Sequence, residues 1–272
     1  MITSTDNSRL KEARKLQRRR HRHQTETFLI EGTRLVSDAL HSKARFREVY
    51  FVPDLVENQP SAQQLLAQLM ATGVDCVACS TAVFASLTET VTPQGIAAVT
   101  ALPQLPLPAT ITLVLLLDQV RDPGNAGTLI RAAEAAGVDL VIFGPETVDP
   151  FNDKVVRAGM GAHFRLPLRV CSTWLEITAL LPPAFPLYVA QAQASLPYDA
   201  VDWSMPAGLV IGGEAAGASA TAYELAQPIA IPMQGQVESV NAAMAGAVIL
   251  FEAARQRRDD AHHFSQHSAT VR

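Results

Sequence analysis

The sequence has few cysteines and no long hydrophobic run. Its three cysteines, Cys76, Cys79 and Cys171, are too few for a disulfide framework, which favours the reducing cytoplasm. The longest apolar stretch, residues 242–251, is shorter than the roughly 20 residues of a membrane-spanning helix. The N-terminus is polar and basic and lacks the apolar core of a secretory signal. We therefore expect a soluble cytoplasmic protein without a membrane segment.

The sequence also lacks the spacing of a metal site and of a dinucleotide-binding motif. The CxxC pair Cys76 and Cys79 has no second CxxC or HxxxH nearby, so we interpret it as two small buried thiols. Three histidines near the C-terminus, His262, His263 and His267, lie in a polar stretch that is typical of a frayed end. Because GxGxxG is absent, a nucleotide-binding oxidoreductase is the least favoured functional class. We expect no metal.

Positive charge is concentrated near the N-terminus. Residues 1–108 carry 12 Lys and Arg against 10 Asp and Glu, whereas residues 109–272 carry 10 against 16. The candidate RNA contacts lie in the basic segment RLKEARKLQRRRHRH and are Arg18, Arg19, Arg20 and Arg22. Such a charge density either binds a phosphate backbone, with release of counterions, or forms a solvated basic helix. This segment by itself leaves both interpretations open.

A proline-rich segment divides the chain. Three prolines fall within ALPQLPLPAT, residues 101–110, which is typical of a semi-rigid extended linker. We therefore predict an N-terminal domain at 1–103, a linker at 104–109, a C-terminal domain at 110–260 and a polar tail at 261–272. With 48% hydrophobic residues, the chain can bury a substantial core.

Hydrophobic periodicity predicts an α/β fold in both halves. In the N-terminal half it indicates helices at 9–22, 33–42, 61–71 and 81–87 and strands at 47–52, 74–78 and 95–100. In the C-terminal half it indicates strands at 111–117, 139–143, 186–190, 208–212 and 228–232 and helices at 125–136, 152–160, 173–181 and 239–257. Apolar strands that alternate with helices imply a mostly parallel sheet covered on both faces.

Three turns in the C-terminal half follow predicted strands and combine glycines with polar side chains. Ligands bind at the carboxyl ends of strands in such sheets, so these turns are candidate site segments. The first, DQVRDPGNAGTLIR, has Asn125 as a helix cap and Arg131 six residues later. The second, IGGEAAG, places Glu214 among glycines. The third, IPMQGQVESVNAAMAG, offers Ser239 as a helix cap and Asn241 in the first turn.

Each of these residues also has a purely structural interpretation. Asn125 and Ser239 could be ordinary N-caps, Arg131 a surface arginine and Glu214 a loop carboxylate, while the glycines could serve turns. That explanation needs three separate coincidences at three strand ends. We therefore favour a functional site.

The same segments resemble the motifs of a known family. NAGTLIR is similar to its first motif, VRAGMGAHFRLPL at 156–168 to its second, and IGGEAAG with IPMQGQVESVNAAMAG to its third. The family is the SpoU/TrmH RNA 2'-O-ribose methyltransferases of the SPOUT superfamily. FLIEGTRLVSDAL and TVTPQGIAAV resemble the N-terminal substrate-binding domain that many members carry.

The resemblance implies a fold, a reaction and partners. The C-terminal domain would be a SPOUT fold with a deep trefoil knot, preceded by a small α/β RNA-binding domain. The activity would be S-adenosylmethionine-dependent 2'-O-methylation of RNA, with ribosomal RNA favoured over transfer RNA. The enzyme would be a homodimer, each site lying near the partner subunit.

The resemblance also implies roles for individual residues. S-adenosylmethionine would lie against the backbone of Gly212, Ile231 and Val240, beside Met233. The catalytic residues would be Asn125, Arg131, Glu214, Ser239 and Asn241. We expect Arg131 to act electrostatically on the developing alkoxide, because an arginine side chain stays protonated. Glu214 would orient Arg131 or an amide, and the remaining residues would fix the ribose.

The chain departs from the family pattern at four positions. Gly159 stands where many relatives have serine, and Ala215 and Ala216 follow the glutamate where glycine is usual. Val240 replaces a leucine, which is a mild change. Methyl groups at 215 and 216 could narrow the loop. A catalytically weakened RNA-binding or ribosome-assembly factor of the same fold is therefore the alternative function.

Overall fold

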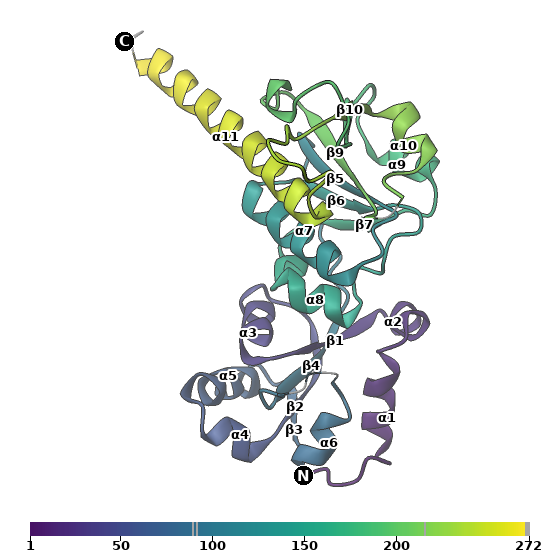
Figure 1. Ribbon diagram of the computed structural model, residues 1–272. Helices are drawn as coiled ribbons and strands as arrows, with labels where there is room; N and C mark the ends of the chain where they lie inside the picture. Colours follow the sequence, from purple (N-terminus) through teal and green to yellow (C-terminus); the bar gives the residue numbers. More distant parts are fainter. Residues whose placement is uncertain (89, 91, 215, 270–272) are drawn as a thin grey trace. The chain divides into compact units, whose positions relative to one another are not determined.

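The chain forms two compact units (Figure 1). The computed structural model describes residues 1–88, 90, 92–214 and 216–269, with side chains as far as residue 259. The N-terminal unit comprises Met1–Gln104 and Phe151–Arg165, and the C-terminal unit comprises Leu105–Pro150 and Leu166–Arg272. The first boundary falls within the predicted linker. The chain returns to the N-terminal unit at Phe151–Arg165, whereas the prediction has two continuous domains.

The N-terminal unit contains a four-stranded sheet. Its order is β1 (Thr27–Glu31), β4 (Ile96–Ala101), β2 (Phe46–Phe51) and β3 (Asp75–Ala78). The β2–β3 pair is parallel and the other two pairs are antiparallel. The small α/β fold expected for this half is confirmed. Strand β1 was missed because its central residues Phe28, Leu29 and Ile30 are all apolar, so the sequence shows no alternation there.

Both faces of this sheet are covered by helices. Phe28 and Ile30 share one core with residues of α3 (Thr33–His41) and α5 (Pro60–Ala71). Tyr50 belongs to a second core. That core includes residues of α1 (Ser8–Lys15) and α6 (Thr81–Ala85), and the short helix α4 (Pro53–Glu57) precedes α5. Val49, the neighbour of Tyr50 in β2, belongs to the first core, because successive residues of a strand point to opposite faces of the sheet.

The segment Phe151–Arg165 packs into the first of these cores. It contains α8 (Asp153–Gly159) and the short helix η1 (Ala162–Phe164). The rings of Phe151 and Phe164 lie 5.1 and 5.8 Å from that of Phe28. Aromatic packing of this kind explains why the second motif segment belongs largely to the N-terminal unit.

The basic segment forms two helices instead of the single helix predicted at 9–22. Helix α1 ends at Lys15, and α2 spans Arg19–Thr25. Arg22 is only 3% exposed, and its Nη1 donates to the carbonyl oxygens of Leu16 and Gln17, just beyond the end of α1. The prediction that Arg22 contacts RNA is therefore corrected, because its guanidinium is buried against the protein's own backbone. Arg18, Arg19 and Arg20 are exposed.

The C-terminal unit contains a six-stranded sheet in which every pair is parallel. The strand order is β10 (Gln227–Ile229), β8 (Leu187–Ala190), β9 (Ala207–Gly212), β5 (Leu113–Asp118), β6 (Leu140–Phe143) and β7 (Leu168–Val170). The expected mostly parallel sheet is confirmed. The trefoil knot stays a prediction.

Helices cover both faces of this sheet as well (Figure 1). On one face, Ile177 of α9 (Trp174–Leu180) and Ala222 of α10 (Ala220–Leu225) pack against alternate strand residues. On the other face lie α7 (Pro123–Ala136) and α11 (Ala242–Ala269), which contact each other closely. A Cβ atom built at Gly246 of α11 would lie 2.3 Å from Leu129 of α7, so the glycine permits this approach.

Helix α11 is longer than predicted. It runs on to Ala269, through most of the stretch expected to be a tail, and the side chains of His262, His263 and His267 lie outside the described ones. Within the described residues, no helix has the length and hydropathy to cross a bilayer. That same part of the chain holds no group of three or more His, Cys, Asp or Glu suited to a metal ion.

Candidate active site

The site lies where β5 and β9 end side by side. Asp118 pairs with Gly212 at the carboxyl ends of these strands, and the chain then turns into α7. Asp122 caps α7, its Oδ1 accepting a hydrogen bond of 2.7 Å from the backbone N–H of Asn125. Asn125 is therefore not the cap that was expected. The cap moves to Asp122 because Pro123 takes the first helical position, and the buried Asn125 side chain is left to face the site.

The loop that carries Glu214 is held by close backbone contacts. Gly213 and Gly217 exchange two backbone hydrogen bonds of 2.9 Å, and Gly217 has a φ of +72°. A Cβ at Gly212 would lie 2.2 Å from the backbone nitrogen of Ala218, which no side chain can tolerate. Asp118, which is fully buried, accepts a hydrogen bond of 2.6 Å from the N–H of Ser219 at the far end of the loop. The glycines thus fix the position of Glu214.

Three of the predicted catalytic residues form one hydrogen-bond network. Asn125 donates through Nδ2 to Oε1 of Glu214. Asn241 donates through Nδ2 to Oδ1 of Asn125 at 3.0 Å and to Oε1 of Glu214 at 3.2 Å. The network joins residues 89 and 116 positions apart in the sequence. Glu214 is placed to orient amides, which was one of its two expected roles.

Asn241 also sets the start of α11. Its Oδ1 accepts hydrogen bonds from the N–H groups of Ala243 at 2.9 Å and Met244 at 3.2 Å. The expectation that Ser239 caps this helix is wrong, because the helix begins at Ala242 and Asn241 supplies the capping oxygen. The two ends of the Asn241 amide therefore act separately, since the oxygen holds the helix and the nitrogen holds the network.

Arg131 does not join the network within one chain. It lies on the exposed side of the third turn of α7. Residues six apart on an α-helix are turned by about 120° around its axis, so Arg131 and Asn125 face different directions. Arg131 lines neither of the two cavities described next.

A cavity of about 400 Å³ opens on one side of the network. All four residues predicted to contact the cofactor line it, namely Gly212, Ile231, Met233 and Val240. Its polar lining side chains are those of Gln191, Glu214, Ser239 and Asn241. Sites for small organic molecules have about this volume and this mixture of apolar walls with a few polar groups. Gln191 was missed, although its place directly after β8 follows the same strand-end rule.

A second cavity of about 220 Å³ shares one wall with the first. Gly212, Gly213, Glu214 and Ala242 line both cavities. The second is completed mainly by the turn after β5, through Gln119, Arg121, Asp122 and Asn125. Glu214 therefore stands between two spaces, an arrangement suited to the transfer of a group from one bound molecule to another.

Comparison with known families agrees with this arrangement. The SpoU rRNA Methylase family matches residues 112–251, and the MRM3-like substrate binding domain matches residues 7–98. The chain is similar to the 23S rRNA (guanosine(2553)-2'-O)-methyltransferase RlmP of Bacillus subtilis, with 37% identity over 92% of this chain and 97% of that protein. It is also similar to the human mitochondrial rRNA methyltransferase 3, with 32% identity over 88% of this chain and 70% of that protein.

Solved structures give the same result. An AdoMet-bound rRNA methyltransferase from Sinorhizobium meliloti has a TM-score of 0.81 and 32% identity, covering 93% of this chain and 97% of the other. The SpoU methyltransferase AviRb from Streptomyces viridochromogenes, in complex with AdoMet, has a TM-score of 0.80 and 27% identity, covering 93% and 100%. This chain therefore belongs to the SpoU family of RNA 2'-O-methyltransferases.

Proposed function

We propose that this protein transfers a methyl group from S-adenosylmethionine to a ribose 2'-oxygen of ribosomal RNA. The observation that carries the proposal is the Asn125–Glu214–Asn241 network, which stands between a cofactor-sized cavity and a second cavity. The RNA class follows from the names of similar proteins, because RlmP acts on 23S rRNA. The three cysteines are free thiols, which supports the cytoplasmic location expected from their number.

The residues of the first cavity fit the cofactor. The backbone at Gly212, Ile231 and Val240, with Met233 beside it, would hold S-adenosylmethionine, which supplies a methyl group already activated on a positively charged sulfur. The protein's contribution is then mainly orientation. Asn125 would hold the ribose through the amide hydrogen and the oxygen lone pair that the network leaves free. Glu214 and Asn241 would keep this amide in place, and Ser239 would line the approach.

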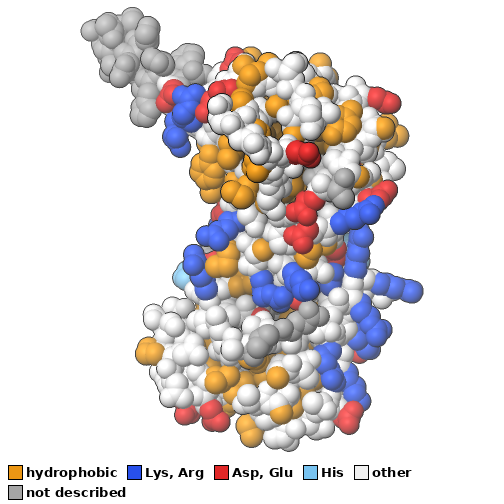
Figure 2. Space-filling model, in the orientation of Figure 1, with side chains coloured by type: hydrophobic (Ala, Val, Ile, Leu, Met, Phe, Trp, Pro, Cys, Tyr) orange, Lys and Arg blue, Asp and Glu red, His pale blue; other side chains and the backbone are white. Residues whose placement is uncertain are grey.

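Arg131 enters this proposal through a homodimer. Met244, Val248 and Phe251 are exposed apolar residues spaced along one face of α11, and Figure 2 shows hydrophobic side chains gathered there. Since α7 packs against α11, a partner subunit bound to this face would come close to Arg131. Arg131 of the partner subunit would then complete the site and stabilise the developing alkoxide.

The dimer can be tested with one charged substitution. Phe251→Glu should convert the protein to a monomer in light scattering and remove its activity. Val170→Glu is the matched control, because Val170 is similarly exposed but lies on β7. A dimeric Phe251→Glu variant with full activity would refute this part of the proposal.

The basic segment RLKEARKLQRRRHRH provides a contact with RNA outside the two cavities, and this contact does not depend on the RNA sequence. Figure 2 shows Lys and Arg side chains over α1 and α2, where Arg18, Arg19 and Arg20 are exposed. Replacing these three with alanine should weaken binding to 23S rRNA and flatten its salt dependence by up to about 2.5 in log–log slope. Affinity for S-adenosylmethionine should not change. An unchanged salt slope would show that this basic segment does not contact RNA.

The function itself is tested by methyl transfer. The protein is incubated with labelled S-adenosylmethionine and in-vitro transcribed 23S rRNA, which is then digested to nucleosides. We expect one labelled 2'-O-methylated nucleoside. Absence of label in any RNA, from protein that still binds the cofactor, would favour the assembly-factor alternative. Of the departures behind that alternative, Ala216 lines the second cavity, Gly159 is buried in α8, and Ala215 lies outside the described residues.

A further inference from the structure

We propose that the second cavity receives the target nucleotide and that Arg121 holds its phosphate. The inference rests on the proposed function and assigns the part of the site that contacts the RNA. The oxygen of a methyl acceptor must approach the methyl group of the donor in line, so the acceptor has to bind in a space that adjoins the cofactor cavity. The second cavity adjoins the first, and both are lined by Gly212, Gly213, Glu214 and Ala242. Its 220 Å³ suits part of one nucleotide better than a second cofactor-sized molecule.

Arg121 has the chemistry that phosphate recognition needs. It is the one cation among the described residues that line this cavity. Its guanidinium pairs with Glu146, and the two side chains are 72% and 58% exposed. An ion pair so open to water contributes little stability, so Arg121 can exchange this partner for a phosphate. A planar guanidinium binds phosphate through two parallel hydrogen bonds.

The carboxylates near Arg121 are already engaged. Asp122 accepts the capping hydrogen bond of α7, and Glu214 accepts from Asn125 and Asn241. The cavity also adjoins the first turn of α7, a 14-residue helix whose N-terminus carries partial positive charge. An incoming phosphate that displaces Glu146 therefore meets the exposed Arg121 and the N-terminus of α7, and these have to outweigh the charge of the Asp122 and Glu214 carboxylates.

The turn that carries Arg121 is held in an unusual conformation. Gln119 has a φ of +62°, a left-handed conformation that non-glycine residues seldom adopt. Its N–H donates to the carbonyl of Pro145 at 3.2 Å, and the carbonyl of Val120 accepts from Val148 at 2.9 Å. A Cβ at Gly213 would lie 2.5 Å from the carbonyl oxygen of Gln119. Such backbone strain persists where surrounding contacts enforce it and is often found at ligand sites.

The test compares Arg121→Ala and Arg121→Lys with wild type, and Arg258→Ala serves as the control. Arg258 is exposed on α11 and lines neither cavity. With in-vitro transcribed 23S rRNA, Arg121→Ala should raise KM at least about 10-fold, as expected for the loss of a charged hydrogen bond, and lower the salt slope by about 1. Arg121→Lys should recover part of the loss. The Kd for S-adenosylmethionine and the melting temperature should stay at wild-type values.

The outcomes separate this inference from the proposed function. If wild type methylates the RNA and Arg121→Ala has the same KM and salt slope, the function stands and the inference is overturned. If wild type transfers no methyl group, the proposed function fails. Fluorescence anisotropy with the same RNA and S-adenosylhomocysteine then decides about Arg121: weaker binding by Arg121→Ala supports the phosphate contact, and equal binding overturns it.

Discussion

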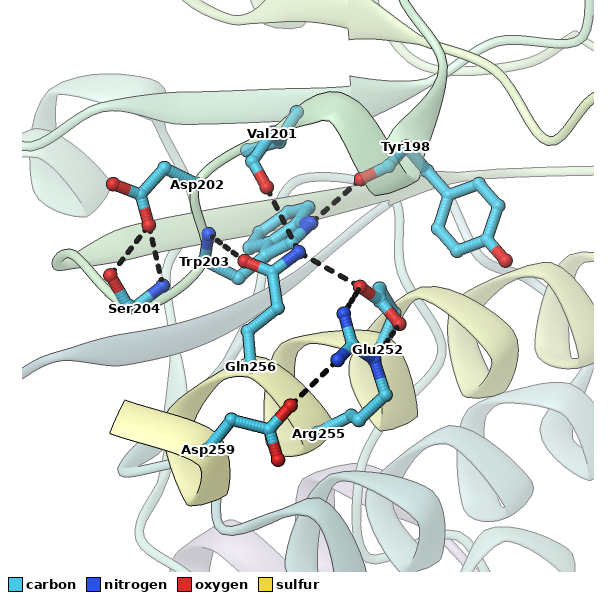
Figure 3. A network of polar contacts seen from close by, with 9 residues as sticks. All are labelled: Tyr198, Val201, Asp202, Trp203, Ser204, Glu252, Arg255, Gln256 and Asp259. Carbon is cyan, nitrogen blue, oxygen red and sulfur yellow. Dashed lines mark hydrogen bonds and ion pairs between the residues drawn. The ribbon is translucent and has the colours of Figure 1, made fainter. Parts of the chain in front are cut away.

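Two polar networks lie along helix α11, and their surroundings differ. At the start of the helix, Asn241 joins Asn125 and Glu214 beside two cavities. About four turns further on, Gln256 binds the backbone around Trp203, which is fully buried (Figure 3). The first network connects side chains from three distant segments, whereas the second ties one helix mainly to backbone groups of the loop around Trp203 and of Thr112.

The second network is bound mostly to backbone groups. Gln256 accepts from the N–H of Trp203 at 2.8 Å and donates to the carbonyl of Val201 at 3.1 Å. Arg257 donates to backbone carbonyls of Trp203, Thr112 and Met205. Partial burial lowers the pKa of Arg257 below its ordinary value. A ligand cannot take the place of these contacts without unfolding the loop, so we assign the network to stability and the Asn241 network to chemistry.

The largest effect should follow from breaking the first network. Glu214→Ala removes the acceptor shared by Asn125 and Asn241, and misplaced amides should lower kcat by about 100-fold. Gln256→Ala is the matched control from the second network and should lower the melting temperature while kcat changes little. Wild-type kcat for Glu214→Ala would refute the distinction between the two networks.

The loop that supports Glu214 provides the next test. In Gly212→Ala the new methyl group would lie 2.2 Å from the backbone nitrogen of Ala218, so the loop has to move. We expect Kd for S-adenosylmethionine to rise more than about 10-fold, with a stability loss of about 1–3 kcal/mol. Gly235→Ala is the control, because a Cβ at Gly235 has no atom within 4 Å. Calorimetric titration measures the Kd of both variants, and urea unfolding measures their stability. Equal affinities would show that the close approach of Gly212 to Ala218 is unimportant for cofactor binding.

Substitutions in the second network should lower stability and leave kcat nearly unchanged. Arg257→Ala leaves several carbonyl acceptors without their donor and should lower the free energy of unfolding by about 1–3 kcal/mol. The kcat of the folded protein should stay within about twofold of wild type, since Arg257 lines neither cavity. Urea unfolding measures the change, with the exposed neighbour Arg258→Ala as control. A loss of kcat without a loss of stability would reverse the assignment.

The smallest effect concerns pH. Hydrogen bonds from Arg255, and to a lesser degree Gln256, lower the pKa of Glu252 from 4.5 to about 2 (Figure 3). A carboxylate whose pKa is depressed in the folded state stabilises it above the unfolded pKa and loses this effect as pH falls through the folded pKa. The urea midpoints of wild type and Glu252→Gln should therefore differ most at neutral pH and converge near pH 2. A difference independent of pH would contradict this account.

Much of the fold follows from local sequence patterns. Five of the six strands of the parallel sheet and most helices were predicted within a few residues, because apolar periodicity is a short-range property. Strand β7 (Leu168–Val170) and the helices α4 (Pro53–Glu57) and α10 (Ala220–Leu225) were missed, since three to six residues give too short a pattern. The three polar turns were located correctly at strand ends, and their sequences also indicated the family.

Local sequence patterns are sufficient to predict the α/β character, the positions of the motif turns and the set of candidate residues. How each candidate is used depends on the packing of distant segments: Asn241 rather than Ser239 caps α11, Arg22 is buried, and Arg131 faces away from the network. The same packing places Phe151–Arg165 in the N-terminal unit and forms the cavity that Arg121 lines. Capping, burial and cavities depend on contacts between segments up to 145 residues apart, and no local pattern encodes such contacts.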